Sequence, residues 1–204
     1  MLPLAGPRVL LLVAVLEALM VGAILASPHA GEPDLRAAVR LTAAVSLVCF
    51  LLAFTAAPLA RRWPGPGTRW LVANRRWLGL SFAASHAAHG VLLWRLATTT
   101  PGFTASVPLA TKVAGALGFV IIAALAATSN DAAVRALGPR RWTALHTVGI
   151  HYLWIVFAAT YAPQAAHSPF HAVLTVTLLA ALALRWTSRP GHVPATAASA
   201  LRSS

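Results

Sequence analysis

Four histidines lie inside two long apolar segments of this 204-residue chain. The first segment runs from Arg75 to Trp94 and holds His86 and His89, which are three residues apart and therefore lie on neighbouring parts of one helix face. Imidazole is a proton carrier and a common metal ligand. Because ionisable side chains are costly at membrane depth, this pair is a candidate functional site.

Small residues accompany the histidine pair along the same helix face. Four residues follow one another there at helical spacing, namely Gly79, Ala83, His86 and Gly90. A face this narrow can receive a flat, bulky group such as a macrocycle. The alternative is the backbone of a neighbouring helix, because membrane helices pack through small residues.

The second segment holds His146 and His151 and, like the first, begins with two arginines and a tryptophan. If both helices start at the same membrane surface, the rise of about 1.5 Å per residue puts His151 at a depth similar to that of His86 and His89. His146 then lies closer to the surface. His146 and His151 point about 140° apart on an ideal helix, so they are not expected to serve one ligand together.

Histidines that face each other from two helices are the arrangement for axial ligation of a b-type haem. Occupation of both axial positions by imidazole suits electron transfer. For any single histidine, a hydrogen bond to a neighbouring helix is the alternative. Four histidines on two helices favour one haem b, whose iron ligands are expected among four residues, namely His86, His89, His146 and His151.

Composition indicates an all-α, polytopic membrane protein. The chain is 58% hydrophobic and only 10% charged, whereas a soluble domain carries about 25% charged residues. The net charge of +12 comes from arginines in short loops between apolar runs. This placement indicates membrane topology, so no nucleic-acid partner is expected.

Apolar runs and polar breaks predict a bundle of six transmembrane helices, over residues 8–27, 35–60, 75–97, 107–128, 140–161 and 170–186. The first run is expected to be a retained helix, because it is longer than the apolar part of a signal peptide. Glu17 within it is either a proton-handling group or a protonated acid bonded to a neighbouring helix. Residues 1–190 are expected to form the haem-binding domain and residues 191–204 a disordered tail.

Basic residues set the predicted orientation. Twelve lie on the side of the two termini and four on the opposite side, which places both termini in the cytoplasm of a multi-pass inner-membrane protein. Membrane lipid is the expected partner of this surface. The Pro/Gly-rich stretch 61–76 is predicted to be a basic loop between the second and third helices.

Two stretches resemble the ferric-reductase-like transmembrane superfamily, and most closely its haem-binding membrane subunits of the bacterial periplasmic methionine-sulfoxide reductase system. The run Arg75-Arg76-Trp77-Leu78-Gly79-Leu80 followed by His89 resembles the third helix of that family, and the residues around His146 resemble the approach to its fifth. The resemblance implies that His89 and His146 are haem-ligand positions. It also implies electron transfer across the membrane, from a quinol, a reduced flavin or a separate reductase to a periplasmic acceptor protein.

The sequence departs from that family at one position. The superfamily spaces its two fifth-helix histidines about four turns apart, but the residue thirteen positions after His146 is Ala159. The depth estimated from the helix rise favours His151 as the partner of the third-helix histidine, whereas the family motif favours His146. No glycine-rich dinucleotide fingerprint follows a strand, so the chain is not expected to hold NAD(P)H itself. It is expected to be an electron-transfer component or oxidoreductase subunit that receives its electrons from another molecule. The alternative is a small non-redox transporter or assembly subunit whose histidines pack or bind ions.

Overall fold

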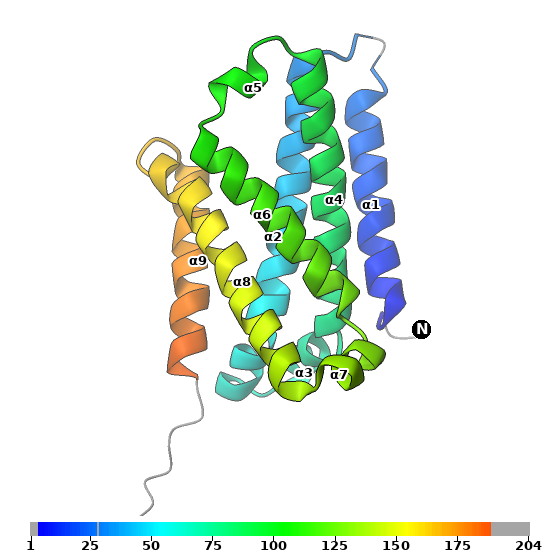
Figure 1. The fold of residues 1–204 in the computed structure, drawn as a ribbon, viewed down its shortest axis with the longest axis vertical. Helices are drawn as coiled ribbons and strands as arrows, with labels where there is room; N and C mark the ends of the chain where they lie inside the picture. The colour runs from blue at the N-terminus through cyan, green and yellow to red at the C-terminus, as the bar shows by residue number, and fades with distance from the viewer. Residues whose placement is uncertain (1–3, 28, 189–204) are drawn as a thin grey trace, which may run out of the picture.

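The computed structural model describes residues 4–27 and 29–188, and all regular structure in these ranges is helical (Figure 1). The predicted all-α class is therefore confirmed, while the predicted tail of residues 191–204 lies outside the described residues. The long helices are α1 (Pro7–Leu25), α2 (Glu32–Arg62), α4 (Arg75–Thr99), α6 (Leu109–Ala127), α8 (Pro139–Tyr161) and α9 (Pro169–Thr187). The short ones are α3 (Pro66–Ala73), α5 (Phe103–Ser106), α7 (Asp131–Leu137) and the 3₁₀ turn η1 (Ala162–Gln164).

Five helices in the described part of the chain are long and apolar enough to cross a membrane, namely α1, α2, α6, α8 together with η1, and α9. Helix α4 is not among them, although its 25 residues exceed the roughly 20 that a bilayer needs. Its serines, histidines and arginines lower its hydropathy. The five apolar helices support a multi-pass membrane protein.

The stretch 61–76 differs from the predicted loop, because it contains the eight-residue helix α3. Proline is favoured at the first turn of a helix, where its missing N–H is not needed, and Pro66 begins α3. Asn74 then separates α3 from α4 and is almost fully buried. Its side-chain oxygen accepts a hydrogen bond from the Gly6 backbone N–H at 2.8 Å, which fixes the start of α1 against this corner.

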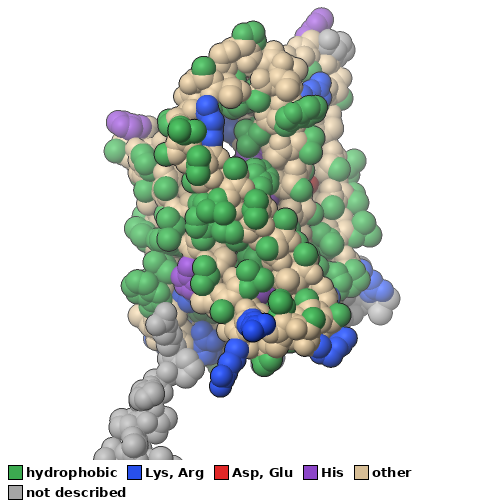
Figure 2. All heavy atoms as spheres, viewed as in Figure 1, with side chains coloured by type: hydrophobic (Ala, Val, Ile, Leu, Met, Phe, Trp, Pro, Cys, Tyr) green, Lys and Arg blue, Asp and Glu red, His purple; other side chains and the backbone are tan. Residues whose placement is uncertain are grey.

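The helices surround a core in which α4 is central. Helix α2 packs along α4, and α4 also contacts α1 and α6, while α8 contacts α6, α7 and α9. Figure 1 shows α6 and α8 crossing the front of the bundle diagonally, with α1, α2 and α4 more upright. Hydrophobic side chains cover the middle of the face in Figure 2, and Lys and Arg gather at the end that carries α3 and α7.

Helix α8 crosses α6 at Gly149. A Cβ atom there would lie 3.0 Å from Cδ2 of Leu125 and 3.2 Å from Cγ2 of Ile121. Both neighbours belong to α6, and Gly149 itself is buried. A small residue at this position is therefore what allows the two helices to approach closely.

Substitution of Gly149 by valine is expected to destabilise the bundle, because an added side chain meets α6 at less than ordinary contact distance. Overpacking of this kind lowers the free energy of unfolding by about 1–3 kcal/mol. Thermal unfolding of the detergent-solubilised protein measures the effect as a lower Tm. Gly115→Val is the matched control, since a Cβ at Gly115 has no neighbour within 4 Å. Equal Tm values for the two variants would contradict the close crossing at Gly149.

Candidate functional site

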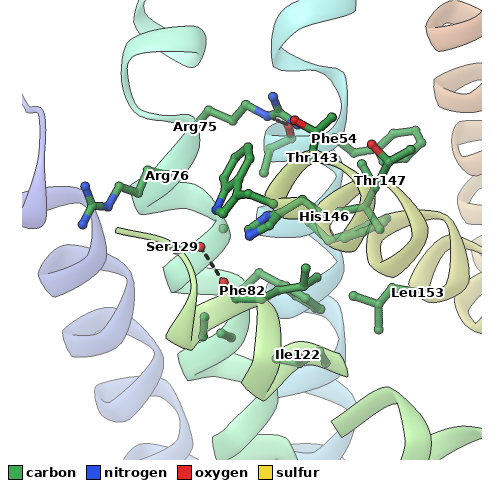
Figure 3. A pocket seen from close by; sticks show the side chains of 18 of the residues that line it. Phe54, Arg75, Arg76, Phe82, Ile122, Ser129, Thr143, His146, Thr147 and Leu153 are labelled. Carbon is green, nitrogen blue, oxygen red and sulfur yellow. Dashed lines mark hydrogen bonds between the residues drawn. The ribbon is translucent and has the colours of Figure 1, made fainter. Parts of the chain in front are cut away.

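A cavity of about 520 Å³ lies between α2, α4, α6 and α8 (Figure 3). Its apolar lining includes Phe50, Phe82, Ile122, Leu125 and Leu153. Its polar lining includes Arg75, Arg76, Asn130, Asp131 and Arg185. The cavity thus combines an apolar wall with a group of cationic side chains, near the end of the bundle that carries α7.

Helix α4 presents small residues to this cavity. Gly79 and Ala83 line it, as the predicted narrow face requires. A Cβ at Gly79 would have no neighbour within 4 Å, so this glycine leaves open space beside the helix. His86 and Gly90, the other two members of that face, do not line the cavity.

Of the four candidate histidines, His146 is the one that lines the cavity. In Figure 3 its ring projects from α8 into the space beside α4. The ring stacks on Trp142 with the centroids 4.1 Å apart and the planes 24° apart. Its Nε2 lies 3.0 Å from Oγ1 of Thr128, and Trp142 Nε1 donates to the backbone oxygen of the same threonine at 2.8 Å. Thr128 and Trp142 therefore hold the imidazole in one orientation.

His89 lies between α4 and α2. Its Nδ1 donates to the backbone oxygen of Val39 at 3.0 Å and lies 3.3 Å from Oγ1 of Thr42. A carbonyl oxygen only accepts, so this contact assigns the ring proton to Nδ1 and the lone pair to Nε2. Metal-ligating histidines are commonly fixed by such a bond from the nitrogen that does not bind the metal.

His86 also lies on the side of α4 that faces α2, and aromatic rings surround it. Its Nδ1 is 3.3 Å from Oγ of Ser46 on α2, and its ring centroid is 5.2 Å from that of His89. The ring of Phe119 lies 4.9 Å away, and a Cβ at Gly90 would meet Phe119 at 2.8 Å. The narrow face at His86 and Gly90 therefore does receive a flat ring, which is the Phe119 side chain of α6.

His151 lies away from both groups. Its Nδ1 donates to the backbone oxygen of Thr147 within α8 at 2.7 Å, and its ring meets the edge of Phe54 at 5.9 Å. The ring of α8 that contacts His86 is Phe157, at 6.2 Å, six residues beyond His151. Among the described residues, His86 and His89 are the two histidine rings in contact with each other, and both belong to α4. Ala159 is exposed.

Sequence reasoning missed the hydroxyl groups that hold these imidazoles. Thr42, Ser46 and Thr128 each lie 3.0–3.3 Å from a histidine nitrogen. The sequence did contain a spacing pattern for two of them, because Thr42 and Ser46 are four residues apart and so share a helix face. No group of three or more His, Cys, Asp and Glu side chains suited to a metal ion occurs in the part of the chain that the structure describes.

Two curated proteins match this chain. Over 120 residues it is 37% identical to a Ralstonia nicotianae protein named protein-methionine-sulfoxide reductase heme-binding subunit MsrQ, with 53% of this chain and 52% of that protein covered. Over 114 residues it is 30% identical to the protein of the same name from Azospira oryzae, with 44% and 43% covered. The chain is similar to MsrQ.

The predicted resemblance to haem-binding subunits of methionine-sulfoxide reductase is thereby confirmed. The chain spans about half the length of the MsrQ proteins that it matches. No family model matches it, and no solved structure matches it.

Proposed function

We propose that this chain is a membrane-embedded b-type haem protein that transfers electrons across or within the membrane. The observation that carries the proposal is the cavity of about 520 Å³ that His146 lines. Its volume lies within the roughly 300–1,000 Å³ of small-molecule and cofactor sites. The names of its MsrQ relatives, which are heme-binding subunits, support the same conclusion.

The residues of the cavity fit haem. His146 offers an imidazole as an axial ligand, and Gly79 and Ala83 leave room beside α4 for a flat ring. Arg75 and Arg76 line the cavity and suit the carboxylates of haem propionates, because charge-assisted hydrogen bonds to guanidinium are strong. When bound, haem supplies a carrier that gains and loses one electron without a change of protein fold.

The protein contributes orientation and a dry environment to that chemistry. Thr128 and Trp142 hold His146 so that its ring does not have to be ordered when iron binds. The apolar side chains around the cavity limit the access of water, which is one way in which a protein tunes a redox centre. Of these, Phe82 and Leu153 are themselves buried.

His89 is the ligand on α4 that the family resemblance implies, and its Nδ1 is held by Val39 while its Nε2 bears the lone pair. Because His89 does not line the cavity, the haem proposed there is assigned His146 as its histidine ligand. The aromatic side chains of Phe82 and Phe119 lie against His86. His86 and His151 are the less favoured ligands. We propose a single haem, in agreement with the sequence-based expectation.

Histidine variants test the ligand assignment. His146→Ala is expected to remove most of the haem, because no other histidine among residues 4–27 and 29–188 lines the cavity. His151→Ala is the matched control on the same helix and is expected to keep the wild-type content, since its ring faces Phe54. The measurement is the haem-to-protein ratio with the reduced absorption spectrum. Full haem content in His146→Ala would refute the proposed site, and a ratio near two in the wild type would refute the single haem.

Filling the cavity tests its role independently of iron ligation. Ala83→Leu places a larger side chain in the cavity and is expected to lower haem affinity at least about tenfold, or 1.4 kcal/mol. Ala84→Leu is the control, because Ala84 is exposed on the neighbouring position of α4. Haem titration of the purified apoprotein measures both affinities. Equal affinities would show that haem does not bind beside Ala83.

We also propose that α4 is a sixth membrane span and that both termini are cytoplasmic. The packing of α4 against α1, α2 and α6 supports this, as does the excess of arginine on one side of the bundle. The protein would then lie in the inner membrane, with α3 and α7 at the cytoplasmic surface.

Reporter fusions test this topology. A reporter that is active only in the cytoplasm is expected to work when it is fused after Arg62 or Arg135, and to fail after Pro101 or Gln164. The first two positions follow α2 or lie within α7, and the last two lie near the opposite ends of α4 and α8. Activity after Pro101 together with inactivity after Arg62 would reverse the proposed orientation.

The electron donor is proposed to be a reduced flavin, a quinol or a separate reductase, and the acceptor a periplasmic protein. The relatives are named subunits of a protein-methionine-sulfoxide reductase, which supports a separate acceptor partner. A non-redox transporter or assembly subunit is the second candidate, supported by the hydrogen bonds that already satisfy His86 and His89. Failure of the purified chain to bind haem at all would favour that candidate.

A further inference from the structure

Glu17 is a buried carboxyl group on α1, whose other buried side chain is Val9. Its neighbours Leu16 and Leu19 are 50% and 65% exposed, whereas Glu17 is 6% exposed. Its Oε1 lies 2.8 Å from Oγ of Ser85, which belongs to α4 and is also buried. Helix α1 therefore carries an ionisable group into the interior of the bundle, where such residues are rare and usually functional.

The hydrogen bonds of Ser85 indicate the protonation state of Glu17. A hydroxyl group has one hydrogen to donate and two lone pairs that accept. The Ser85 hydroxyl lies 2.8 Å from Glu17 Oε1 and 3.1 Å from the backbone oxygen of Thr42. Both contacts are full hydrogen bonds only if Glu17 is the neutral acid and donates to Ser85, while Ser85 donates to Thr42. The arrangement therefore favours a protonated Glu17.

No cation in the described part of the chain neutralises Glu17 as a carboxylate. Arg36 pairs with Glu32 and Arg76 pairs with Asp131, and neither pair involves Glu17. The elements packed against α1 are α2 and α4. Their titratable groups on this side are Cys49, whose thiol is within electrostatic reach of Glu17, and the histidine pair that follows Ser85 on α4. A thiol or an uncharged imidazole supplies no positive charge, so a charged Glu17 would need one from a bound cofactor.

A chain of contacts through Ser85 and Thr42 leads from Glu17 to that histidine pair. Ser85 contacts the backbone oxygen of Thr42, and the hydroxyl group of Thr42 lies 3.3 Å from Nδ1 of His89. Two residues thus separate the carboxyl from the imidazole. Charges interact over longer distances in a protein interior than in water because the effective dielectric constant is lower.

We propose that Glu17 is a proton-binding site that compensates the charge of an electron held in the bundle, an inference that rests on the haem function proposed above. With oxidised haem bound, the Glu17 carboxylate would be the buried counter-ion of one net positive charge at the iron. When one electron from a reduced flavin or quinol cancels that charge, the Glu17 carboxylate would bind one proton from water to form an O–H bond. Departure of the electron to the acceptor breaks this bond and returns the proton to water.

The reduction potential of the haem-loaded full chain, measured at a series of pH values, tests this coupling. The wild-type potential is expected to fall as pH rises, by up to about 59 mV for each tenfold fall in proton concentration. Glu17→Gln mimics the neutral acid and can still donate to Ser85. Its potential is therefore expected to stay near the wild-type low-pH value. Glu32→Gln is the matched control, because it removes an exposed carboxylate and should keep the wild-type slope.

Infrared difference spectra give a second readout. The reduced-minus-oxidised spectrum of the wild type is expected to gain a carboxylic-acid C=O band that is absent from Glu17→Gln. A wild-type slope retained in Glu17→Gln, or the same band in both proteins, would overturn the inference and leave Glu17 as a helix-docking residue. A chain that binds no haem would instead overturn the proposed function, which the absorption spectrum reports separately.

Discussion

Polar groups inside an apolar environment must find their hydrogen-bond partners within the protein, and this constraint organises the contact between α2 and α4. Helix α4 brings two histidines and Ser85 into the bundle. Helix α2 provides their hydrogen-bond partners, which are the Val39 carbonyl, the Ser46 hydroxyl group and the Thr42 backbone oxygen. Because an unsatisfied polar group in hydrocarbon costs several kcal/mol, this pairing is what allows a helix as polar as α4 to lie at the centre of the bundle.

The polar contact between α2 and α4 lies on one side of α4, and an open cavity lies on another. Toward α2 the helix is polar and closed, because His86 and His89 contact Ser46 and Val39 of that helix. Phe119 of α6 packs on His86 and Gly90. Toward α8, lower along the helix, Gly79 and Ala83 face open space that His146 also lines. The small residues of α4 thus serve both uses that their spacing predicts: close packing against a neighbouring helix at Gly90, and room for a flat group at Gly79.

Local patterns in the sequence predicted the helices well, but they did not predict how α4 and α8 pass each other. The six predicted apolar segments agree with α1, α2, α4, α6, α8 and α9 to within a few residues. The loop prediction missed α3, which is too short for hydrophobic periodicity to reveal. The depth comparison assumed two upright helices that start at one level, whereas α8 crosses obliquely (Figure 1) and Phe157 contacts His86. Crossing angles depend on residues such as Gly149, and a count of residues along one helix does not contain them.

A carrier of electrons in a membrane must manage charge as well as iron ligation, because a net charge in hydrocarbon is costly. The proposed haem site and Glu17 lie on different faces of α4, with Ser85 and Thr42 forming the hydrogen-bonded contact on the Glu17 side. Such a separation lets a proton and an electron be held by different groups while their charges still interact through the protein interior. Helix α1, which also packs Val13, Val21 and Ile24 against the apolar clusters of the bundle, would then deliver to α4 the carboxyl group that binds the proton.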